Sequence, residues 1–235
     1  MTTDIVLWTH NRLPLLQQTL SYLFERTTSP YRLTVIDDGS DEGNADYLQD
    51  LWASGKLAGL LLRRESAQFM ANWSIAPWLA QSEVFVLTDD DILCPQLDPD
   101  WLARGLEAMQ RYPRIGILAP HCPSRPPAIH DDRRIGPLVI CDKIGTTLTF
   151  VRRALMRQIA IPIVTGDAVS ANGSHLAMTW ARAARTLGLE VAYLADVYCQ
   201  HIGAVSARNN DDLSARMVEP QDPLTLQPPS GWRDR

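Results

Sequence analysis

The sequence of 235 residues lacks the features of membrane, secreted and zinc-binding proteins. No stretch approaches the roughly 20 apolar residues of a membrane helix, and the first residues lack the basic region and longer apolar region of a signal peptide. The four cysteines, Cys94, Cys122, Cys141 and Cys199, form no C-x-x-C pair and have no zinc-ligand spacing. We therefore expect reduced thiols, no transmembrane segment and a cytoplasmic location, either free or peripheral to a membrane.

Basic residues are also few, with 22 Lys and Arg against 27 Asp and Glu and a formal net charge of −5 at pH 7. A general nucleic-acid-binding protein needs a basic face that neutralises phosphates, so we expect no nucleic-acid partner. With 46% hydrophobic and 21% charged residues, the composition is that of a globular protein. A chain of this length builds a core without disulfides or a structural metal.

Apolar runs alternate with segments of helical periodicity over the first 120 residues. The expected strands are residues 5–8, 33–36, 60–62, 84–87 and 115–118, and the expected helices begin near Pro14, Asn44, Gln68 and Asp98. Strands separated by helices predict βαβ units and a mostly parallel sheet that is covered on both faces. The sequence therefore predicts an α/β fold.

The pattern changes after residue 120. A proline-rich segment predicts a long surface connection up to about residue 145. A strand is expected at 146–151, a helix from Ser174 to about Leu187, and a further strand at 191–194. We expect one domain over residues 1–218 and a Pro-rich tail or flap over residues 219–235.

Carboxylates follow two of the expected strands. Asp37 and Asp38 come directly after the second strand, and the triplet Asp89-Asp90-Asp91 comes one residue after the fourth. Ligands of open α/β sheets bind outside the carboxyl ends of the strands. Consecutive aspartates repel one another unless a cation or donor groups hold them, and Mg²⁺ and Mn²⁺ prefer oxygen ligands. Two interpretations remain open, a metal that bridges to phosphate or aspartates that cap a turn and face water.

Other polar side chains are expected at the same edge of the sheet. Thr9, Asn11 and Arg12 follow the first strand, where they could reach a base, ribose or phosphate, and His201 follows the last strand. The alternatives are an ordinary polar loop and a surface histidine. The Gly39-Ser40 pair is too short for a phosphate-binding loop of the Walker or dinucleotide type.

Four segments carry recognisable motifs. Residues 5–12 read Ile-Val-Leu-Trp-Thr-His-Asn-Arg, residues 35–40 read Val-Ile-Asp-Asp-Gly-Ser, Asn72 precedes the aspartate triplet, and residues 201–203 read His-Ile-Gly. These segments resemble motifs of family 2 nucleotide-sugar glycosyltransferases. The first two resemble the family's Thr-x-Asn-Arg strand and its Val-x-Asp-Asp-Gly-Ser signature. Asn72 resembles the Asn of the helix before the D-x-D motif, and residues 201–203 resemble the late His-x-Gly. The resemblance implies the GT-A fold, a three-layer α/β/α, Rossmann-like fold with a mostly parallel central sheet.

The same resemblance implies a donor-binding half over about residues 1–120 and an acceptor half over about residues 121–218. It implies that a UDP- or GDP-sugar is bound by Thr9, Asn11, Arg12, Asp37, Asp38, Asn72, Asp89 and Asp90. Thr9 and Asp37 would hold the nucleobase side. A cation, Mn²⁺ or Mg²⁺, would be ligated by Asp91 with Asp89 and His201, and it would neutralise charge on the departing nucleoside diphosphate. Because three aspartates are consecutive, the register of D-x-D stays open by one residue.

One position departs from the family pattern. The family has an acidic pair at the start of the helix that here begins near Ser174, and its Asp is the general base. Residues 172–177 read Asn-Gly-Ser-His-Leu-Ala and contain no carboxylate. Asp167 and His175 are the candidate bases. If neither reaches the acceptor, the alternatives are a retaining route, in which the leaving phosphate takes the proton, or an inactive protein.

These observations predict an enzyme that moves a sugar from a nucleoside-diphosphate sugar to a hydroxyl of a saccharide, lipid-linked, protein or small-molecule acceptor. The first alternative is a non-catalytic nucleotide-sugar-binding or scaffold protein, which the missing acidic pair favours. The second is a nucleotidyltransferase, which normally has a Gly-rich, basic loop after its first strand. Residues 9–13 contain no glycine. The sequence does not define the oligomeric state.

Overall fold

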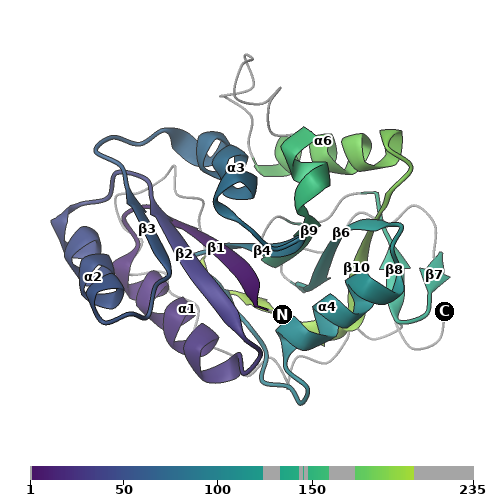
Figure 1. Ribbon diagram of the computed structural model, residues 1–235, viewed down its shortest axis with the longest axis horizontal. Coiled ribbons are helices and arrows are strands. Elements are labelled where there is room, and N and C mark those ends of the chain that lie inside the picture. The colour runs from purple at the N-terminus through teal and green to yellow at the C-terminus, as the bar shows by residue number, and fades with distance from the viewer. Residues whose placement is uncertain (1, 124–132, 143–144, 146–147, 159–172, 204–235) are drawn as a thin grey trace.

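The computed structural model describes residues 2–123, 133–142, 145, 148–158 and 173–203 (Figure 1). Its large sheet consists of β1 (Thr3–Thr9), β2 (Tyr31–Asp37), β3 (Gly59–Leu62), β4 (Val84–Asp89), β6 (Ile115–His121), β7 (Arg134–Ile135), β8 (Leu138–Ile140), β9 (Leu148–Arg152) and β10 (Glu190–Tyr198). Two short strands, β5 (Ile92–Leu93) and β11 (Gln200–His201), form a separate pair. The helices are α1 (Leu13–Arg26), α2 (Glu42–Ala53), α3 (Gln68–Leu79), α4 (Trp101–Arg111) and α6 (Gly173–Thr186).

The strand order of the large sheet is β3-β2-β1-β4-β9-β6-β10-β8-β7. The first four strands in this order run parallel, and β6 is parallel to β10. Strand β9 is antiparallel to both of its neighbours, and β8 and β7 continue the edge in antiparallel pairing. The chain therefore builds outward from β1 to β3 and then crosses back to place β4 on the other side of β1. The expected α/β fold with a sheet that is parallel at its core is confirmed.

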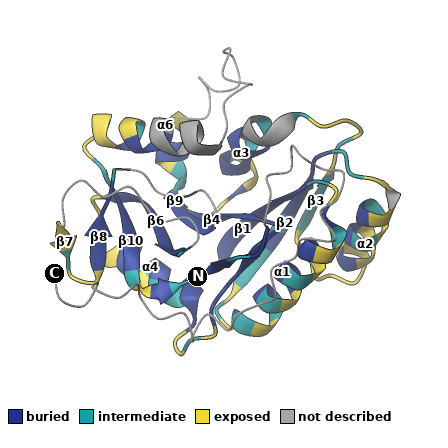
Figure 2. Ribbon diagram, turned by 180° about the vertical axis from the view of Figure 1, so that it is seen from behind, coloured by how far each residue is buried: buried dark blue, intermediate teal, exposed yellow. Residues whose placement is uncertain are grey.

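Helices cover both faces of this sheet, which gives the expected three layers (Figure 1). Alternate residues of each strand point to opposite faces: Leu7 of β1 packs in a cluster with leucines of α1 and α2 and with Trp101 of α4. Trp8 packs in a second cluster with Trp73 of α3 and Trp180 of α6. Figure 2 shows the buried sheet between helices whose outer sides are exposed.

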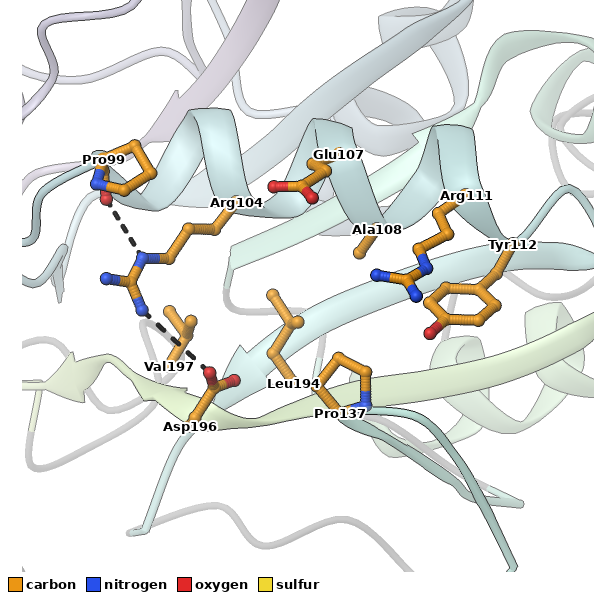
Figure 3. A pocket seen from close by; sticks show the side chains of 10 residues that line it. All are labelled: Pro99, Arg104, Glu107, Ala108, Arg111, Tyr112, Pro137, Leu194, Asp196 and Val197. Carbon is orange, nitrogen blue, oxygen red and sulfur yellow. Dashed lines mark hydrogen bonds and ion pairs between the residues drawn. The ribbon is translucent and has the colours of Figure 1, made fainter.

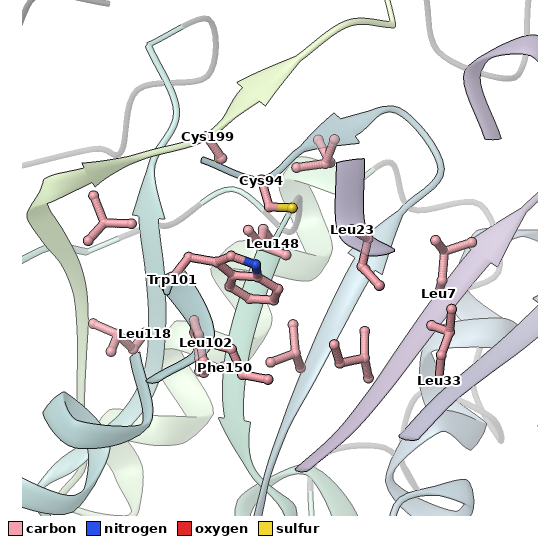
Figure 4. Close-up of a cluster of buried hydrophobic side chains, with 14 of the residues drawn as sticks. Leu7, Leu23, Leu33, Cys94, Trp101, Leu102, Leu118, Leu148, Phe150 and Cys199 are labelled. Atoms are coloured by element: carbon pink, nitrogen blue, oxygen red, sulfur yellow. The ribbon is translucent and has the colours of Figure 1, made fainter. Parts of the chain in front are cut away.

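Trp101 stands at the centre of the first cluster (Figure 4). Its ring meets Phe150 of β9 edge to face at 5.7 Å, and its indole N–H donates to Oγ1 of Thr27 at 2.9 Å. Because the polar atom of this buried indole has a partner, the ring can be buried without an unsatisfied donor. All four cysteines are free, and all four are buried, which the sequence did not predict.

Two helix starts differ from the expectation. The side chain that caps α2 is Asp41, which accepts from the backbone N–H of Asn44, so Asn44 lies inside the helix. Helix α4 is capped by Asp100 and not by Asp98, because Asp100 accepts from Ala103 N at 2.8 Å. Aspartate and asparagine both suit a cap position, so residue type alone did not distinguish between these neighbours.

The expected surface connection after residue 120 is wrong in part. Strands β7 and β8 form a hairpin that extends the sheet, and β8 is buried and pairs with β10. A hairpin this short has too few residues for alternation to be visible in the sequence. The predicted tail at 219–235 lies outside the described residues. Among the described helices, none has the length and hydrophobicity needed to span a bilayer.

Candidate functional site

The two groups of aspartates and the loop after β1 meet at one edge of the sheet. Thr9, Asp37 and Asp89 are the last residues of β1, β2 and β4, and these parallel strands are direct neighbours. Between β1 and β4 the strand order reverses, which is where open α/β sheets bind ligands. The structure therefore brings the predicted residues of three separate segments to the switch point of the sheet.

The two aspartates after β2 have different surroundings. Oδ1 of Asp37 accepts from Ser40 N at 2.9 Å, whereas its buried Oδ2 has no hydrogen-bond partner among the described residues. Asp38 accepts from Ser66 Oγ at 2.7 Å and from Ala67 N at 2.8 Å. Asp38 thus ties two loops together, and Asp37 retains a buried acceptor atom.

The glycine that follows Asp38 is required for steric reasons. Gly39 has φ of 73°, and a methyl group there would lie 2.7 Å from backbone atoms of Glu65 and Ser66. A side chain at this position would therefore be strained and would separate the two loops. The Asp-Asp-Gly-Ser turn can carry its aspartates at this edge only because residue 39 is small.

Asn11 joins the loops that follow β1 and β2. Its backbone N–H donates to Ser40 Oγ at 2.9 Å, and its side-chain oxygen accepts from Asp41 N at 2.8 Å. Asn11 has φ of 50°, a left-handed conformation that asparagine tolerates better than most residues. The hydrogen bonds of Asn11 thus support the loop that carries Arg12.

Arg12 crosses from this loop to the aspartate triplet. Its side chain is almost fully buried, forms an ion pair through Nη2 with Oδ1 of Asp90, and donates from Nη1 to Oδ2 of Asp91 at 2.6 Å. Burial alone lowers the pKa of Arg12, but Asp90, Asp91 and Asp89 outweigh burial and raise it. The guanidinium therefore carries a full positive charge among three carboxylates.

Asp90 is the most enclosed member of the triplet. Besides Arg12, it accepts from Thr9 Oγ1 at 2.7 Å, and its backbone carbonyl accepts from Thr19 Oγ1 at 2.9 Å. Burial raises the pKa of Asp90, the Arg12 guanidinium lowers it, and the Asp91 charge raises it further. Donor groups of the protein hold Asp90 and it does not face water, so the interpretation of a water-facing turn cap is wrong for this residue.

The last described residues return to Asp91. Strand β11 pairs with β5 next to the triplet, His201 Nε2 lies 3.3 Å from Asp91 Oδ2, and Ile202 N donates to the Asp91 carbonyl at 2.9 Å. His201 therefore lies at the predicted edge although it comes 110 positions after Asp91 in the sequence.

Asn72 of α3 lies at the side of this edge and contacts Arg63, which is absent from the predicted set of site residues. Arg63 Nε donates to Asn72 Oδ1 at 2.9 Å and is 3.8 Å from Asp38 Oδ1. Arg63 directly follows β3, so the same rule that singled out Asp37, a polar residue at the carboxyl end of a strand, could have found it.

The two candidate bases are not placed at this site by the structure. Asp167 lies outside the described residues, and His175 lies in the first part of α6, where only the backbone is described. Their predicted role as the general base therefore stays a prediction.

The predicted cation ligands do not form a complete metal site by themselves in the part of the chain that the structure describes. Across the described segments, no group of three or more His, Cys, Asp and Glu side chains has an arrangement that could hold a metal ion. Mg²⁺ is usually bound by one or two carboxylates together with waters and substrate phosphates, and Mn²⁺ accepts the same oxygen ligands. A site of this kind would need substrate to complete it, and the predicted role of Asp91, Asp89 and His201 as cation ligands stays a prediction.

A cavity of about 240 Å³ lies elsewhere, between α4 and β10 (Figure 3). Its charged side chains include Arg104, which donates to the carbonyls of Pro99 and Asp98 and lies 4.0 Å from Asp196. None of the predicted site residues lines this cavity. The candidate site is therefore the acidic edge and not this pocket.

The sheet is parallel at its core, and its buried aspartates lie at the switch point where open α/β sheets bind ligands. The chain belongs to glycosyl transferase family 2, whose family model matches residues 4–171. The family resemblance that the sequence motifs carry is thereby confirmed.

Solved structures share the GT-A fold of this chain. Mannosyltransferase PcManGT from Pyrobaculum calidifontis, in complex with GDP-Man and Mn²⁺, has a TM-score of 0.65 at 18% identity over 87% of this chain and 58% of its own. GalNAc-T7 with UDP, GalNAc and Mn²⁺ has a TM-score of 0.66 at 12% identity over 86% of this chain and 44% of its own. TarS residues 1–349 from S. aureus gives 0.59 at 16% identity, with coverage of 84% and 60%.

The chain thus spans 44% to 60% of the length of these three structures. No curated protein sequence matches it.

Proposed function

We propose that this chain transfers a sugar from a nucleoside-diphosphate sugar to an acceptor hydroxyl with the help of a divalent cation. One observation carries the proposal: Asp37, the aspartate triplet and His201 converge at the carboxyl edge of β1, β2 and β4. The family membership supports glycosyl transfer in general. The GDP-Man and Mn²⁺ complex of PcManGT supports the class of donor and cation.

Asp37 is proposed to contact the nucleoside. Its buried Oδ2 is an acceptor with no partner among the described residues, and such an atom is costly unless a ligand donates to it. Uracil and guanine both present ring N–H donors, so this atom is compatible with UDP- and GDP-sugars alike. The Thr9 hydroxyl donates a hydrogen bond to Asp90, so its oxygen would act as a hydrogen-bond acceptor toward a nucleoside.

The diphosphate and cation are proposed to lie beside Asp91, with Asp89 and His201 as further ligands. A cation bound there would neutralise negative charge on the departing nucleoside diphosphate. The residues of the chain hold the diphosphate side of the donor in a fixed position against an acceptor, which lowers the entropic cost of the reaction. Hydrogen bonds between the loops support this site, and they are made by Asp38, Asn11, Arg63 and Asn72.

The acceptor side is proposed to lie in residues 121–218, with the 219–235 tail beside it. Asp167 and His175 are the proposed alternatives for the base that takes the hydroxyl proton. Each is replaced with Ala, and only one of the two variants should have a lower turnover. If neither variant has a lower turnover, a retaining route or an inactive protein is favoured.

A thermal-shift screen tests the proposal. UDP, GDP and their sugars are added with and without Mn²⁺ or Mg²⁺, and a ligand at 100 times its Kd should add about 2.7 kcal/mol to stability. For a chain of this size, that corresponds to a Tm rise of roughly 5–11 °C. Asp37→Asn should reduce the rise, whereas Asp50→Asn, an exposed change on α2, should not. If none of these ligands raises Tm with either cation, the proposal is wrong.

A second function, a non-catalytic nucleotide-sugar-binding protein, is favoured by the absence of a carboxylate in residues 172–177. It predicts the same thermal shifts but no release of nucleoside diphosphate from the donor in the presence of any acceptor. Measuring that release separates the two functions. The nucleotidyltransferase alternative gains no support from the family match.

A further inference from the structure

We infer that Arg12 is a positioning residue that fixes Asp91 for the donor and withdraws Asp90 from donor binding. The inference rests on the proposed function. It also takes Asp90 out of the ligand set, because Asp90 is enclosed by protein donors.

The bridging geometry of Arg12 requires a guanidinium. One terminal nitrogen pairs with Asp90 and the other with Asp91, and only 4% of the side chain is exposed. A guanidinium is planar and holds its donors in a fixed fork, whereas a lysine ammonium is a single point charge. Lysine at this position keeps the charge but cannot hold both carboxylates in the same geometry.

The oxygens of Asp90 are already committed to protein donors. Oδ1 accepts from Arg12, Oδ2 accepts from Thr9, and the side chain is 0% exposed. A cation that bound to Asp90 would have to displace both of these hydrogen bonds in a buried site. Asp90 therefore anchors Arg12 and is the member of the triplet whose two oxygens are both taken up by protein donors.

Arg12 also joins three segments that are distant in the sequence. Asp91, which it holds, is the residue that His201 and the Ile202 backbone approach. A methyl group at Gly203 would overlap with Oδ2 of Asp91 and lie 3.2 Å from Arg12 Nη1. The position of Asp91 is thus set by the loop after β1 and by residues 201–203 together.

The charge of this group also fits the inference. One guanidinium compensates the charge of one carboxylate, so the triplet keeps a net negative charge that suits a divalent cation. The guanidinium also lowers the repulsion between the aspartates. Arg12 in this way prepares the site without taking the place of the cation.

A double-mutant cycle tests whether Arg12 acts through Asp91. The Kd of UDP and GDP with saturating Mn²⁺ is measured by calorimetry for Arg12→Lys, Asp91→Asn and the double variant. Arg12→Lys should weaken binding about tenfold or more in the parent protein, and by less than about twofold when Asp91 is already Asn. Arg26→Lys is the matched control, because Arg26 lies on α1, donates to the Cys94 carbonyl and does not contact the triplet.

Equal losses in both backgrounds would overturn the inference, since Arg12 would then act independently of Asp91. Hydrogen exchange of the amides of residues 200–203 in the ligand-free protein provides a second measurement. Arg12→Lys should speed this exchange about tenfold or more, and Arg26→Lys should leave it unchanged. Unchanged exchange in Arg12→Lys would also overturn the inference.

These two measurements separate the inference from the proposed function. If the parent protein binds neither nucleotide but exchange in residues 200–203 responds to Arg12→Lys, the proposed function fails and the positioning of Asp91 by Arg12 stands. If the parent protein binds a nucleotide and Arg12→Lys binds it equally well, the proposed function stands and the role of Arg12 is refuted.

Discussion

Replacing Gly203 with alanine tests the packing of the last described residues against the aspartate triplet. The added methyl group would overlap with Oδ2 of Asp91 and with its carboxyl carbon at 3.0 Å, and these atoms belong to a side chain that Arg12 holds. Adding a methylene to a well-packed site typically costs about 1–3 kcal/mol. At about 2–4 °C per kcal/mol for a chain of this size, Tm should fall by roughly 2–12 °C.

The same change should weaken nucleotide binding, because moving the Asp91 carboxylate breaks its charge-assisted hydrogen bond. Such bonds contribute about 1.5–3 kcal/mol, so the Kd of UDP or GDP with Mn²⁺ should rise about tenfold or more. Differential scanning fluorimetry and calorimetry measure the two effects. Gly43→Ala is the control, since a methyl group there has its nearest neighbour at 3.7 Å. A Gly203→Ala protein with the Tm and Kd of the parent would refute the described packing.

Three further changes have defined outcomes. Asp100→Ala should lower the free energy of unfolding by about 1–2 kcal/mol or more, because Asp100 caps α4 and also accepts from the backbone of Thr28 and Ser29; urea denaturation measures this. Burial raises the pKa of Asp4, but hydrogen bonds from Arg32, Ser82 and Gln81 outweigh it and lower the pKa. A lowered pKa contributes stability above the ordinary carboxyl pKa of about 3.9 that is lost as pH falls toward the folded value, so Asp4→Asn should flatten the acid limb of a plot of stability against pH. Asp91→Asn should abolish the Mn²⁺ dependence of nucleotide binding, measured by calorimetry on the folded variant.

Each of these changes has an outcome that contradicts its physical reason. An Asp100→Ala protein as stable as the parent would mean that solvent replaces the cap without cost. If the acid limbs of Asp4→Asn and the parent protein are parallel, the Asp4 carboxylate has the same pKa in the folded and the unfolded protein. Retained Mn²⁺ dependence in Asp91→Asn would exclude Asp91 as a cation ligand.

The order of elements and the location of the acidic edge were predictable because both depend on local pattern. Asp37 and Asp89 end buried strands, and parallel strands bring their carboxyl ends to one edge whatever the rest of the chain does. The fold of the first 120 residues follows from the same alternation of strand and helix. Local pattern placed His201 after the last strand and left two interpretations open, and the family motif favoured the one in which it lies at the acidic edge.

The contacts within the site were not predictable from the sequence. That Arg12 pairs with Asp90 and Asp91, and that Thr9 donates to Asp90, depends on loop geometry that no spacing encodes. Strands β5 and β11 have two residues each, too few for a periodic pattern, yet they return the chain to the triplet. The hairpin of β7 and β8 was hidden for the same reason.

The pairing of β11 with β5 has a consequence for chimeras made from relatives of this chain. A chimera that exchanges the two halves near residue 120 would replace the segment that covers the aspartates with one evolved for a different loop. His201 and Gly203 therefore belong with the N-terminal half in any such exchange, despite their distance along the chain. Recombination that preserves the acidic edge needs two crossover points, one on each side of the segment between β6 and β11.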